Sequence, residues 1–552
     1  MSTVETFKNE EIRAEQRYFS QLKTVVETAF YGNNAVEIES IKQAYHLAKE
    51  APNTIVMDQH VQFAEELGLP SQAHILVQNG GAVVGRTAAA RRIVGQNPKE
   101  DEVLEKIIRE AAYQGSLKPF YRATTIVGLD EEFMVKAHIT MPQTQINNLY
   151  SWLLNFQIYN AQYSKRYKNS VTYDENDIYV FFDPDWRHPD YPNGLAYFDP
   201  EHNVAMILGL NYFGEIKKGT LTLAWGTAAR NGFCSCHGGL KIFRDVNERD
   251  YVASFFGLSG SGKSTLTHAK HNDKYNIEVL HDDAFVINLI TGSSVALEPS
   301  YFDKTNDYPV GHREQNYFMT VQNVGVTRNK EGERVLVTQD IRNGNGRTVK
   351  SRYATPNRVD HITEPINAIY WIMKDDSLPP VLKINDPVLA ATFGCTLATK
   401  RSSAENIIGK QDELVIEPYA NPFRVYPLVE DYEKFKALFE ERQVDCYIVN
   451  TGFFLNDKVK PHHTLGIIES NVEQTATYMD FPLLKDVQYA EIEDFHIPVE
   501  DNAYRVKLRN RMQRRLDYVL EHNKLYPNHP LPAEVISSLQ ELIREIASTL
   551  DA

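Results

Sequence analysis

A glycine-rich stretch at residues 257–264 constrains this chain more than any other feature. It reads Gly-Leu-Ser-Gly-Ser-Gly-Lys-Ser and satisfies the phosphate-loop pattern G-x-x-x-x-G-K-S/T in full. A β-branched and aromatic run at residues 251–256 precedes it, and residues 264–268 can begin a helix. Glycines let successive backbone N–H groups face a phosphate, and the helix N-terminus adds favourable charge. The pattern predicts an α/β fold with a strand, a phosphate-binding loop and a helix here.

The loop also predicts which residues contact a nucleotide. Lys263 can reach the β- and γ-phosphates, and the Ser264 hydroxyl can bind the Mg²⁺ that accompanies the nucleotide. The other expected contacts are Leu258, Ser259, Gly260, Ser261, Gly262 and Thr265. A strand-like run from residue 277 ends in Asp282 and Asp283. Adjacent carboxylates at a strand end face different ways, so one can hold metal while the other accepts a hydrogen bond.

Composition limits the class of protein. The 552 residues include 58 Lys+Arg and 73 Asp+Glu, which gives a formal net charge of 58 − 73 = −15. This balance argues against a general nucleic-acid binder, which needs a basic face. The 4 cysteines are too few for a disulfide scaffold and are expected to be reduced thiols. With neither a signal peptide nor a long apolar window, we expect a cytoplasmic protein without membrane spans.

Periodicity along the chain places helices and strands around the loop. Helical periods are expected at about residues 9–50 and 99–114, and amphipathic helices in the final fifty residues. Strand-like runs occur at residues 74–78, 124–128, 177–182 and 204–209, and strands dominate from the loop to about residue 428. Residues 183–194 are dense in turn formers and are expected to form a surface loop.

Several further sequence segments follow one another in an order that can be compared with known families. Residues 211–219, Asn-Tyr-Phe-Gly-Glu-Ile-Lys-Lys-Gly, are followed by Cys-Ser-Cys-His at residues 234–237 and by the phosphate loop. Val-Gly-Arg-Thr stands at residues 84–87, Lys-Ser-Arg-Tyr-Ala-Thr-Pro at 350–356, and Tyr-Ile-Val-Asn-Thr-Gly at 447–452. From about residue 80 to 470, this order resembles the ATP-dependent phosphoenolpyruvate carboxykinases. Their segments read Y-x-G-E-M-K-K-G, S-M-H-C, G-L-S-G-T-G-K-T, G-R-S-P-K-D-K, N-T-R-x-x-Y-P and L-V-N-T-G-W.

The resemblance implies an activity. It is the conversion of oxaloacetate and ATP to phosphoenolpyruvate, CO₂ and ADP, as a gluconeogenic or anaplerotic step. The matching positions imply Mn²⁺ ligands at Lys218, His237 and Asp283, with Mg²⁺ bound through Ser264. Arg86 would bind a substrate carboxylate, and Tyr212 would lie near the departing carboxylate. The remaining residues implied to be catalytic are Lys217, Lys218, Lys263, Asp282 and Arg352.

The resemblance also implies an architecture. We expect an N-terminal α/β substrate-binding domain over residues 1–240. A C-terminal mixed α/β nucleotide-binding domain over residues 241–552 would carry the phosphate loop and a helical tail, and the active site would lie in the cleft between the two domains. The expected partners are small molecules, not nucleic acid or membrane, and the protein is expected to be a monomer or a small homo-oligomer.

Three departures from the family pattern keep other functions open. Ala284 and Phe285 stand where the family has glutamate and histidine. Residues 393–405 replace the family's lid sequence, and Lys458 and Thr464 stand at its adenine-contacting positions. His462 and His463 are expected to be exposed loop residues. The alternatives are a kinase of the same fold acting on another small acid or hydroxyl compound, and a non-catalytic nucleotide-binding regulator.

Overall fold

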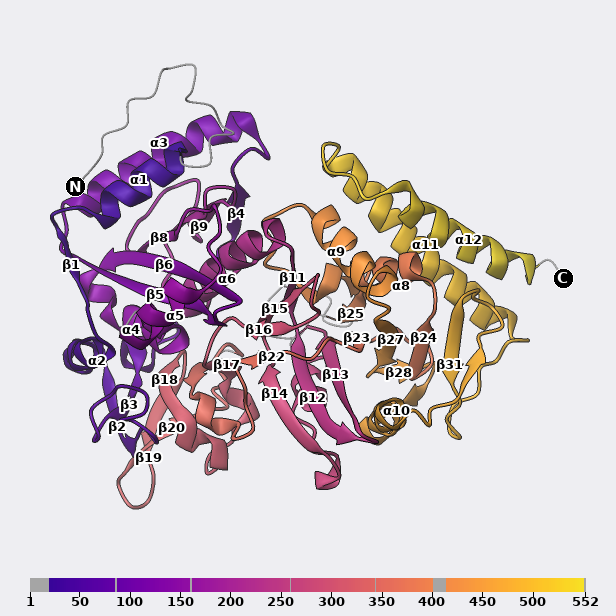
Figure 1. Ribbon diagram of the computed structural model, residues 1–552. Coiled ribbons are helices and arrows are strands. Elements are labelled where there is room, and N and C mark those ends of the chain that lie inside the picture. Colours follow the sequence, from indigo (N-terminus) through magenta and orange to yellow (C-terminus); the bar gives the residue numbers. More distant parts are fainter. Residues whose placement is uncertain are drawn as a thin grey trace. The chain divides into compact units, whose positions relative to one another are not determined.

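The computed structural model in Figure 1 describes residues 19–84, 87–158, 161–258, 260–342, 344–400 and 414–550. Its contacts divide the chain into two compact units. The first contains Met1–Thr227 and Leu297–Pro356, and the second contains Ala228–Ala296 and Asn357–Ala552. This division differs from the single boundary expected after residue 240. The physical reason is that residues 297–356 supply strands to a sheet of the first unit.

An eight-stranded sheet is the largest sheet of the first unit. Its strands run in the order β1-β5-β6-β8-β10-β9-β4, and β7 pairs with β5. Their bounds are β1 (Ala35–Glu37), β4 (Ala90–Ile93), β5 (Phe120–Asp130), β6 (Phe133–Pro142), β7 (Gln157–Ile158), β8 (Ile178–Asp183), β9 (Leu195–Asp199) and β10 (Val204–Leu208). The parallel neighbours β8 and β10 are buried along their whole length, as strands covered on both faces are.

The helices of the first unit include two that lie side by side over one face of this sheet, α1 and α3 (Figure 1). The helices are α1 (Gln21–Phe30), α2 (Ile41–Glu50), α3 (Pro98–Ser116), α4 (Ile146–Asn155), α5 (Ala161–Asn169) and α6 (Phe213–Arg230). Ser20 caps α1 by accepting a hydrogen bond from the Lys23 N–H at 2.9 Å. Leu22 and Leu104, one from each helix, belong to the same buried cluster as Met206 of β10.

A five-stranded sheet explains why residues 297–356 belong to the first unit. Its order is β17-β21-β18-β3-β2. The strands are β2 (Ile55–His60), β3 (His74–Val77), β17 (Tyr301–Lys304), β18 (Phe318–Gln322) and β21 (Arg347–Lys350), with a hairpin of β19 (Gly325–Arg328) and β20 (Arg334–Val337). The parallel pair β3–β18 joins the returning segment to the N-terminal part of the chain.

The second unit is built on another eight-stranded sheet, of order β14-β12-β13-β23-β27-β24-β31-β30. The bounds are β12 (Gly239–Val246), β13 (Arg249–Phe256), β14 (Asn276–His281), β23 (Ala368–Met373), β24 (Val381–Ile384), β27 (Asp445–Asn450), β30 (Tyr478–Asp480) and β31 (Val487–Ala490). The strands β13, β23 and β27 are parallel neighbours, so their carboxyl ends lie at one edge. Phe255, Tyr370 and Tyr447 stack across them, with ring centroids 5.1 and 4.9 Å apart.

Smaller sheets and six helices complete the described part of the second unit. A four-stranded sheet runs β11 (Phe233–His237), β15 (Ala284–Asn288), β16 (Ser294–Ala296) and β22 (His361–Ile362). Two hairpins pair β25 (Ala398–Lys400) with β26 (Leu414–Ile416), and β28 (Phe453–Phe454) with β29 (Asp457–Lys458). The helices are α7 (Lys263–Thr267), α8 (Pro387–Cys395), α9 (Leu428–Glu440), α10 (Pro461–Glu473), α11 (Asn502–Leu525) and α12 (Ala533–Ser548).

The structure confirms the helix expected near residues 99–114, the strand before the phosphate loop and the C-terminal helices, which are α3, β13, α11 and α12. The helical stretch expected at residues 9–50 is interrupted by β1, and its first ten residues lie outside the described part of the chain. The expectation of two exposed loop histidines is wrong in part: both lie on α10, where His462 is exposed but His463 is only 9% exposed, because its ring packs against Phe495.

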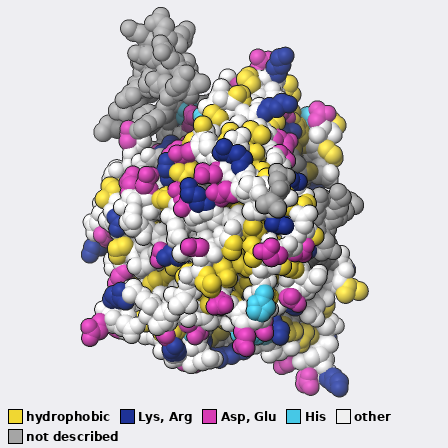
Figure 2. All heavy atoms as spheres, turned by 90° about the vertical axis from the view of Figure 1, so that its right-hand side faces the viewer, with side chains coloured by type: hydrophobic (Ala, Val, Ile, Leu, Met, Phe, Trp, Pro, Cys, Tyr) yellow, Lys and Arg dark blue, Asp and Glu magenta, His cyan; other side chains and the backbone are white. Residues whose placement is uncertain are grey.

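The surface and the cysteines agree with the composition. On the face that Figure 2 presents, acidic and basic side chains are interspersed among hydrophobic ones. All 4 cysteines lie in the described part of the chain, where they are buried and form no disulfide. Among the described helices, none combines the length and apolar character that a membrane crossing requires.

Candidate active site

The glycine-rich loop connects β13 to the short helix α7 in the second unit. Gly260 and Gly262 have φ angles of 80° and 103°, which side chains with a Cβ rarely adopt. The Ser261 N–H donates to the Leu258 carbonyl at 2.9 Å and tightens the turn. Lys263 is 8% exposed, whereas Ser264 and Thr265 are exposed at the start of α7. Ser259 lies outside the described residues.

Two neighbouring strand ends hold this loop from the side. The Lys374 ammonium, just after β23, donates to the Gly260 carbonyl at 2.8 Å. The Thr451 hydroxyl, just after β27, donates to the Ser261 carbonyl at 2.5 Å. The parallel order β13-β23-β27 brings all three strand ends to one edge, which is where open α/β sheets bind ligands.

His237, Lys263 and Asp283 come together beside the loop. His237 ends β11 and Asp283 follows β14, and the two are neighbours because β11 pairs with β15, which begins at Ala284. The His237 Nε2 atom lies 2.9 Å from Asp283 Oδ1, and the Lys263 Nζ atom lies 3.8 Å from the same oxygen. His237 is buried and Asp283 is 18% exposed in its side chain, so the carboxylate is the more accessible of the pair.

A backbone carbonyl orients the His237 ring. Nδ1 lies 2.5 Å from the Ala420 carbonyl, and because a carbonyl can only accept, Nδ1 is the donor. The other ring nitrogen, Nε2, is on the side of Asp283. Tyr419 and Ala420 both have φ angles of 52°, a left-handed conformation that presents this carbonyl. The buried pair of Arg424 and Asp431, 2.6 Å apart, anchors the same segment through the Pro418 carbonyl.

Asp282 and Asp283 face different partners, as the sequence predicts for adjacent carboxylates. Asp282 Oδ2 lies 3.2 Å from His268 Nε2 on the side of α7. Burial works to raise the pKa of Asp282, but the His268 hydrogen bond and the nearby cations hold it well below its ordinary value. His281 shapes the turn, since its Nδ1 accepts from the N–H groups of Asp283 and Ala284 at 2.9 and 3.2 Å.

The donor atoms of this cluster fit a divalent cation. An imidazole nitrogen and a carboxylate oxygen can both bind Mn²⁺, and metal-binding histidines commonly donate their other N–H to a carbonyl, as His237 does to Ala420. Among the described residues, no group of three or more His, Cys, Asp or Glu side chains is arranged to hold a metal ion. A complete site here therefore needs donors of another kind, such as amines, hydroxyls, water or nucleotide phosphate.

The first unit contains the other residues expected to act on substrate. Tyr212, 5% exposed, lies immediately before α6. A Cβ on Gly214 would meet the Tyr212 ring at 2.5 Å, so glycine at this position lets the ring lie against the start of the helix. Arg352 is half-buried in a short turn after β21, and Lys218 is half-buried on α6 with its Nζ 5.7 Å from the Trp225 ring centroid.

Lys217 has a different environment from its neighbour Lys218. Successive residues of an α-helix point about 100° apart, so the two side chains diverge. Lys217 is fully buried, and its Nζ lies 2.9 Å from Glu298, whose side chain is also fully buried. The expected catalytic role needs contact with substrate, which this enclosed position does not support. The charge of Lys217 is instead neutralised inside the first unit.

The remaining expected residues fall into two groups. Arg86 and the last part of the expected lid, residues 401–405, lie outside the described part of the chain. Arg91 and Arg92, which follow Arg86, contact Glu215 at 3.9 Å and Glu100 at 2.6 Å. Of the expected adenine contacts, Lys458 is exposed in β29. Thr464 is 2% exposed on α10 and donates to the Pro461 carbonyl, so it offers almost no surface to a nucleotide.

Sequence reasoning missed three residues of this site: His268, Lys374 and Ala420. His268 carried a usable signal, because it follows the glycine-rich loop by one helical turn and contacts Asp282, one of the two carboxylates after β14. Lys374 follows β23, which is parallel to β13. Residues that follow parallel strands gather at the edge of the sheet where ligands bind, and this was the signal for Lys374. Ala420 acts through its backbone carbonyl, for which the side-chain pattern gives no signal.

Comparisons with known proteins give this chain a family and two relatives. The model of the family described as phosphoenolpyruvate carboxykinase matches residues 47–503, so α11 and α12 lie almost entirely beyond it. A phosphoenolpyruvate carboxykinase (ATP) of Aeropyrum pernix is 25% identical over 303 residues, covering 52% of this chain and 60% of that protein. One of Staphylococcus aureus is 25% identical over 321 residues, covering 54% and 55%. The matches thus span little more than half the length of these relatives.

Proposed function

The chain belongs to the phosphoenolpyruvate carboxykinase family, and from this premise we propose that it converts oxaloacetate and ATP to phosphoenolpyruvate, CO₂ and ADP. The observation that carries the proposal is the cluster of His237, Lys263 and Asp283, within 3.8 Å of one carboxylate oxygen and next to the glycine-rich loop. A phosphate-binding loop alone fits many kinases. A histidine and a carboxylate held beside its lysine supply the donors that a metal-dependent phosphoryl transfer needs.

The second unit is proposed to bind the nucleotide. The backbone of residues 257–262 would surround the phosphates, and Lys263 would neutralise charge on the γ-phosphoryl group. Ser264, exposed at the start of α7, would be a ligand of the Mg²⁺ that accompanies ATP. Asp282, held by His268 at 3.2 Å, would accept a hydrogen bond in the same region.

His237 and Asp283 are proposed to hold Mn²⁺, with Lys218 as a further ligand. When bound, a divalent cation would stabilise negative charge on the enolate oxygen and on the transferred phosphoryl group. The Ala420 carbonyl would keep the proton on His237 Nδ1 and so reserve Nε2 for metal. Lysine ligates only as the neutral amine, so this set requires Lys218 to lose its proton.

The first unit is proposed to bind the dicarboxylate. Arg86 would bind one carboxylate with its two-pronged guanidinium, Tyr212 would direct its hydroxyl to the departing one, and Arg352 would neutralise the phosphoryl group. In the reaction, the carbon–carbon bond to the departing carboxylate breaks and leaves its electron pair as an enolate. The enolate oxygen then attacks the γ-phosphorus, and the bond from that phosphorus to the ADP oxygen breaks.

An assay of the full chain tests this proposal. Purified protein with Mn²⁺, Mg-ATP and oxaloacetate should form phosphoenolpyruvate and ADP in equal amounts. The His237→Ala variant should lose turnover but still bind ATP, because His237 is proposed to hold the cation rather than the nucleotide. The exposed His462, on α10 of the same unit, provides the matched control His462→Ala, which should retain turnover. Formation of ADP without phosphoenolpyruvate would contradict the proposal.

One observation favours a second candidate function. Ala284 and Phe285 stand where the family carries glutamate and histidine, and both are fully buried in β15, paired with His237 and Cys236. The site therefore lacks an acid and an imidazole at these two positions. A kinase of the same fold acting on another small acid would fit this change. A screen of small acids for ADP release separates the two functions, and oxaloacetate as the best substrate would exclude this second candidate.

A further inference from the structure

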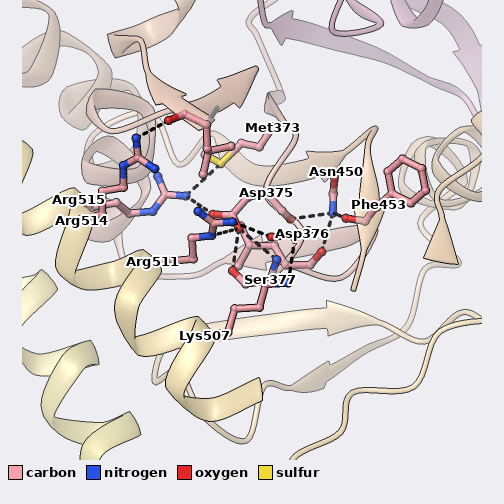
Figure 3. A network of polar contacts seen from close by, with 12 residues as sticks. Met373, Asp375, Asp376, Ser377, Asn450, Phe453, Lys507, Arg511, Arg514 and Arg515 are labelled. Atoms are coloured by element: carbon pink, nitrogen blue, oxygen red, sulfur yellow. Dashed lines mark hydrogen bonds and ion pairs between the residues drawn. The ribbon is translucent and has the colours of Figure 1, made fainter. Parts of the chain in front are cut away.

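The C-terminal helix α11 carries two arginines that converge on one buried carboxylate. Arg515 Nη2 lies 3.1 Å from Asp375 Oδ2, and both side chains are 1% exposed. Arg511 approaches the other oxygen of Asp375 at 3.5 Å. Figure 3 shows both arginines reaching from the helix toward the turn after β23. These residues lie beyond the part of the chain that matches the family, so the family does not account for them.

Asp375 organises the turn in which it lies. Its Oδ1 accepts hydrogen bonds from the Ser377 N–H at 3.1 Å and the Ser377 hydroxyl at 2.7 Å. The Asn450 side-chain amide, at the end of β27, donates to the carbonyls of Asp375, Leu378 and Phe453 at 2.9, 2.7 and 2.8 Å. The ends of β23 and β27 are thus tied into one polar network (Figure 3).

This network is adjacent to both side chains that hold the glycine-rich loop. Lys374, which donates to the Gly260 carbonyl at 2.8 Å, precedes Asp375 in the chain. Thr451, which donates to the Ser261 carbonyl at 2.5 Å, follows Asn450. A shift of the Asp375 turn therefore moves the backbone that carries Lys374. Because Asn450 is bonded to the same turn, the shift also moves the backbone that carries Thr451.

Arg515 is itself fixed by contacts on its other side. It donates to the Thr396 carbonyl after α8 and lies 3.6 Å from the Met373 sulfur at the end of β23. Its neighbour Arg514 donates to the Leu414 carbonyl at the start of β26 at 2.5 Å. The Arg515 guanidinium group thus links α11 to two other segments of the second unit, the end of β23 and Thr396. Lysine has one amine nitrogen in place of the forked guanidinium group of arginine, and it cannot make the same set of hydrogen bonds.

We propose that Arg515 is a positioning residue for nucleotide binding: it holds Asp375 so that Lys374 and Thr451 keep the glycine-rich loop in its binding conformation. The inference rests on the proposed function, which assigns that loop to ATP. It also gives the C-terminal helix a role, since α11 supplies the charge that fixes the turn after β23. Arg515 acts through Asp375 and does not contact the nucleotide.

The test compares the full chain with Arg515→Lys, which keeps the charge and removes the fork. Lys507→Ala is the matched control, because Lys507 lies on the same helix and pairs with Asp376 at 2.8 Å where both side chains are about one-third exposed. Two quantities are measured: the dissociation constant for Mg-ATP by calorimetry, and hydrogen exchange of the backbone amides at residues 260–263 without nucleotide. The exchange reports on the loop even if the protein fails to bind ATP.

Arg515→Lys should weaken Mg-ATP binding about tenfold and speed exchange at residues 260–263, because small displacements of a binding group are costly. Lys507→Ala should match the unmodified protein in both measurements. A lower melting temperature of Arg515→Lys with unchanged exchange and affinity would make Arg515 a purely stabilising residue and overturn the proposal. If the unmodified protein binds no ATP, the proposed function fails, and the exchange result alone decides whether Arg515 positions the loop.

A second variant covers the case in which Arg515→Lys does not fold. Lys374→Met leaves the buried pair of Arg515 and Asp375 intact and removes the bond to the Gly260 carbonyl. It should speed exchange at residues 260–263 and weaken Mg-ATP binding in the same way. Exchange and affinity equal to those of the unmodified protein would show that the contact does not hold the loop, which overturns the proposal.

Discussion

Lys217 and Glu298 form an ion pair of 2.9 Å in which neither side chain is exposed to solvent. Glu298 also accepts a hydrogen bond from the buried Asn155 amide at 2.5 Å. Removing one partner of such a pair leaves an uncompensated buried charge. Glu298→Gln should therefore lower the free energy of unfolding by about 3–5 kcal/mol. Urea denaturation measures this change.

The exposed pair of Lys485 and Glu541, 3.3 Å apart, is the control for that prediction. Glu541→Gln should change the free energy of unfolding by less than about 1 kcal/mol, because solvent screens exposed pairs. Equal effects of Glu298→Gln and Glu541→Gln would contradict a structural role for the Lys217–Glu298 pair. The same result would reopen a direct catalytic role for Lys217.

The burial of Lys241 predicts that the stability of the protein depends on pH. The Lys241 Nζ atom lies beside α7, where it donates to the Leu266 carbonyl at 2.7 Å and contacts His271 at 3.0 Å. His271 in turn contacts Glu469. Burial lowers the pKa of Lys241 to about 7, against a partly offsetting effect of Glu469. The unfolded chain keeps its ordinary value near 10.4.

Between these two pKa values the unfolded chain binds the extra proton, so stability should rise with pH. The slope is at most about 1.4 kcal/mol per pH unit for one group. Denaturation of the unmodified protein and of Lys241→Met, from about pH 7 to about pH 9, isolates this contribution. The difference in unfolding free energy should grow with pH in favour of the unmodified protein. A difference that stays constant would show that Lys241 does not titrate in this range.

Gly214 predicts a steric effect on Tyr212. In Gly214→Ala the new Cβ would meet the Tyr212 ring at 2.5 Å, so the ring must shift. We expect a loss of about 1–2 kcal/mol in stability from this overpacking and a higher KM for oxaloacetate. Gly466, within α10, has open space around it, so Gly466→Ala should instead stabilise by about 0.5–1 kcal/mol. An unchanged KM for oxaloacetate in Gly214→Ala would show that Tyr212 does not contribute to substrate binding.

The metal proposal predicts a loss of Mn²⁺ affinity that needs no turnover to observe. His237→Ala removes a nitrogen ligand held by the Ala420 carbonyl, and Mn²⁺ binding followed by electron paramagnetic resonance should weaken about 10- to 100-fold. His462→Ala, the exposed control, should bind Mn²⁺ normally. Equal Mn²⁺ affinity in both variants would remove His237 from the ligand set.

The sequence predicted those features of the fold and the site that depend on residues close together in the chain. The loop at residues 257–264, the strand before it and the divergent carboxylates Asp282 and Asp283 follow from residue type and spacing, and the structure has them. The order of the motifs identified the family. Each of these signals is local or depends on a short pattern.

The remaining features depend on contacts between distant segments. The return of residues 297–356 to the first unit rests on the pairing of β3 with β18, which no local period indicates. Lys217 was expected to be catalytic, and its buried partner Glu298 lies 81 positions further along the chain, beyond the reach of any local pattern. The carbonyl that orients His237 belongs to Ala420, 183 residues away in the chain. A backbone atom at that separation has no side-chain pattern by which the sequence can reveal it.

The fate of the γ-phosphate tests the central claim most directly. The full chain is incubated with Mn²⁺, oxaloacetate and Mg-ATP that carries an isotopic label in the γ-phosphate, and the labelled product is identified by mass spectrometry. We predict that the label appears in phosphoenolpyruvate, that CO₂ is released in equal amount, and that both cease in Lys263→Ala. Label recovered in inorganic phosphate or in another phosphorylated acid, with no phosphoenolpyruvate, would contradict the account.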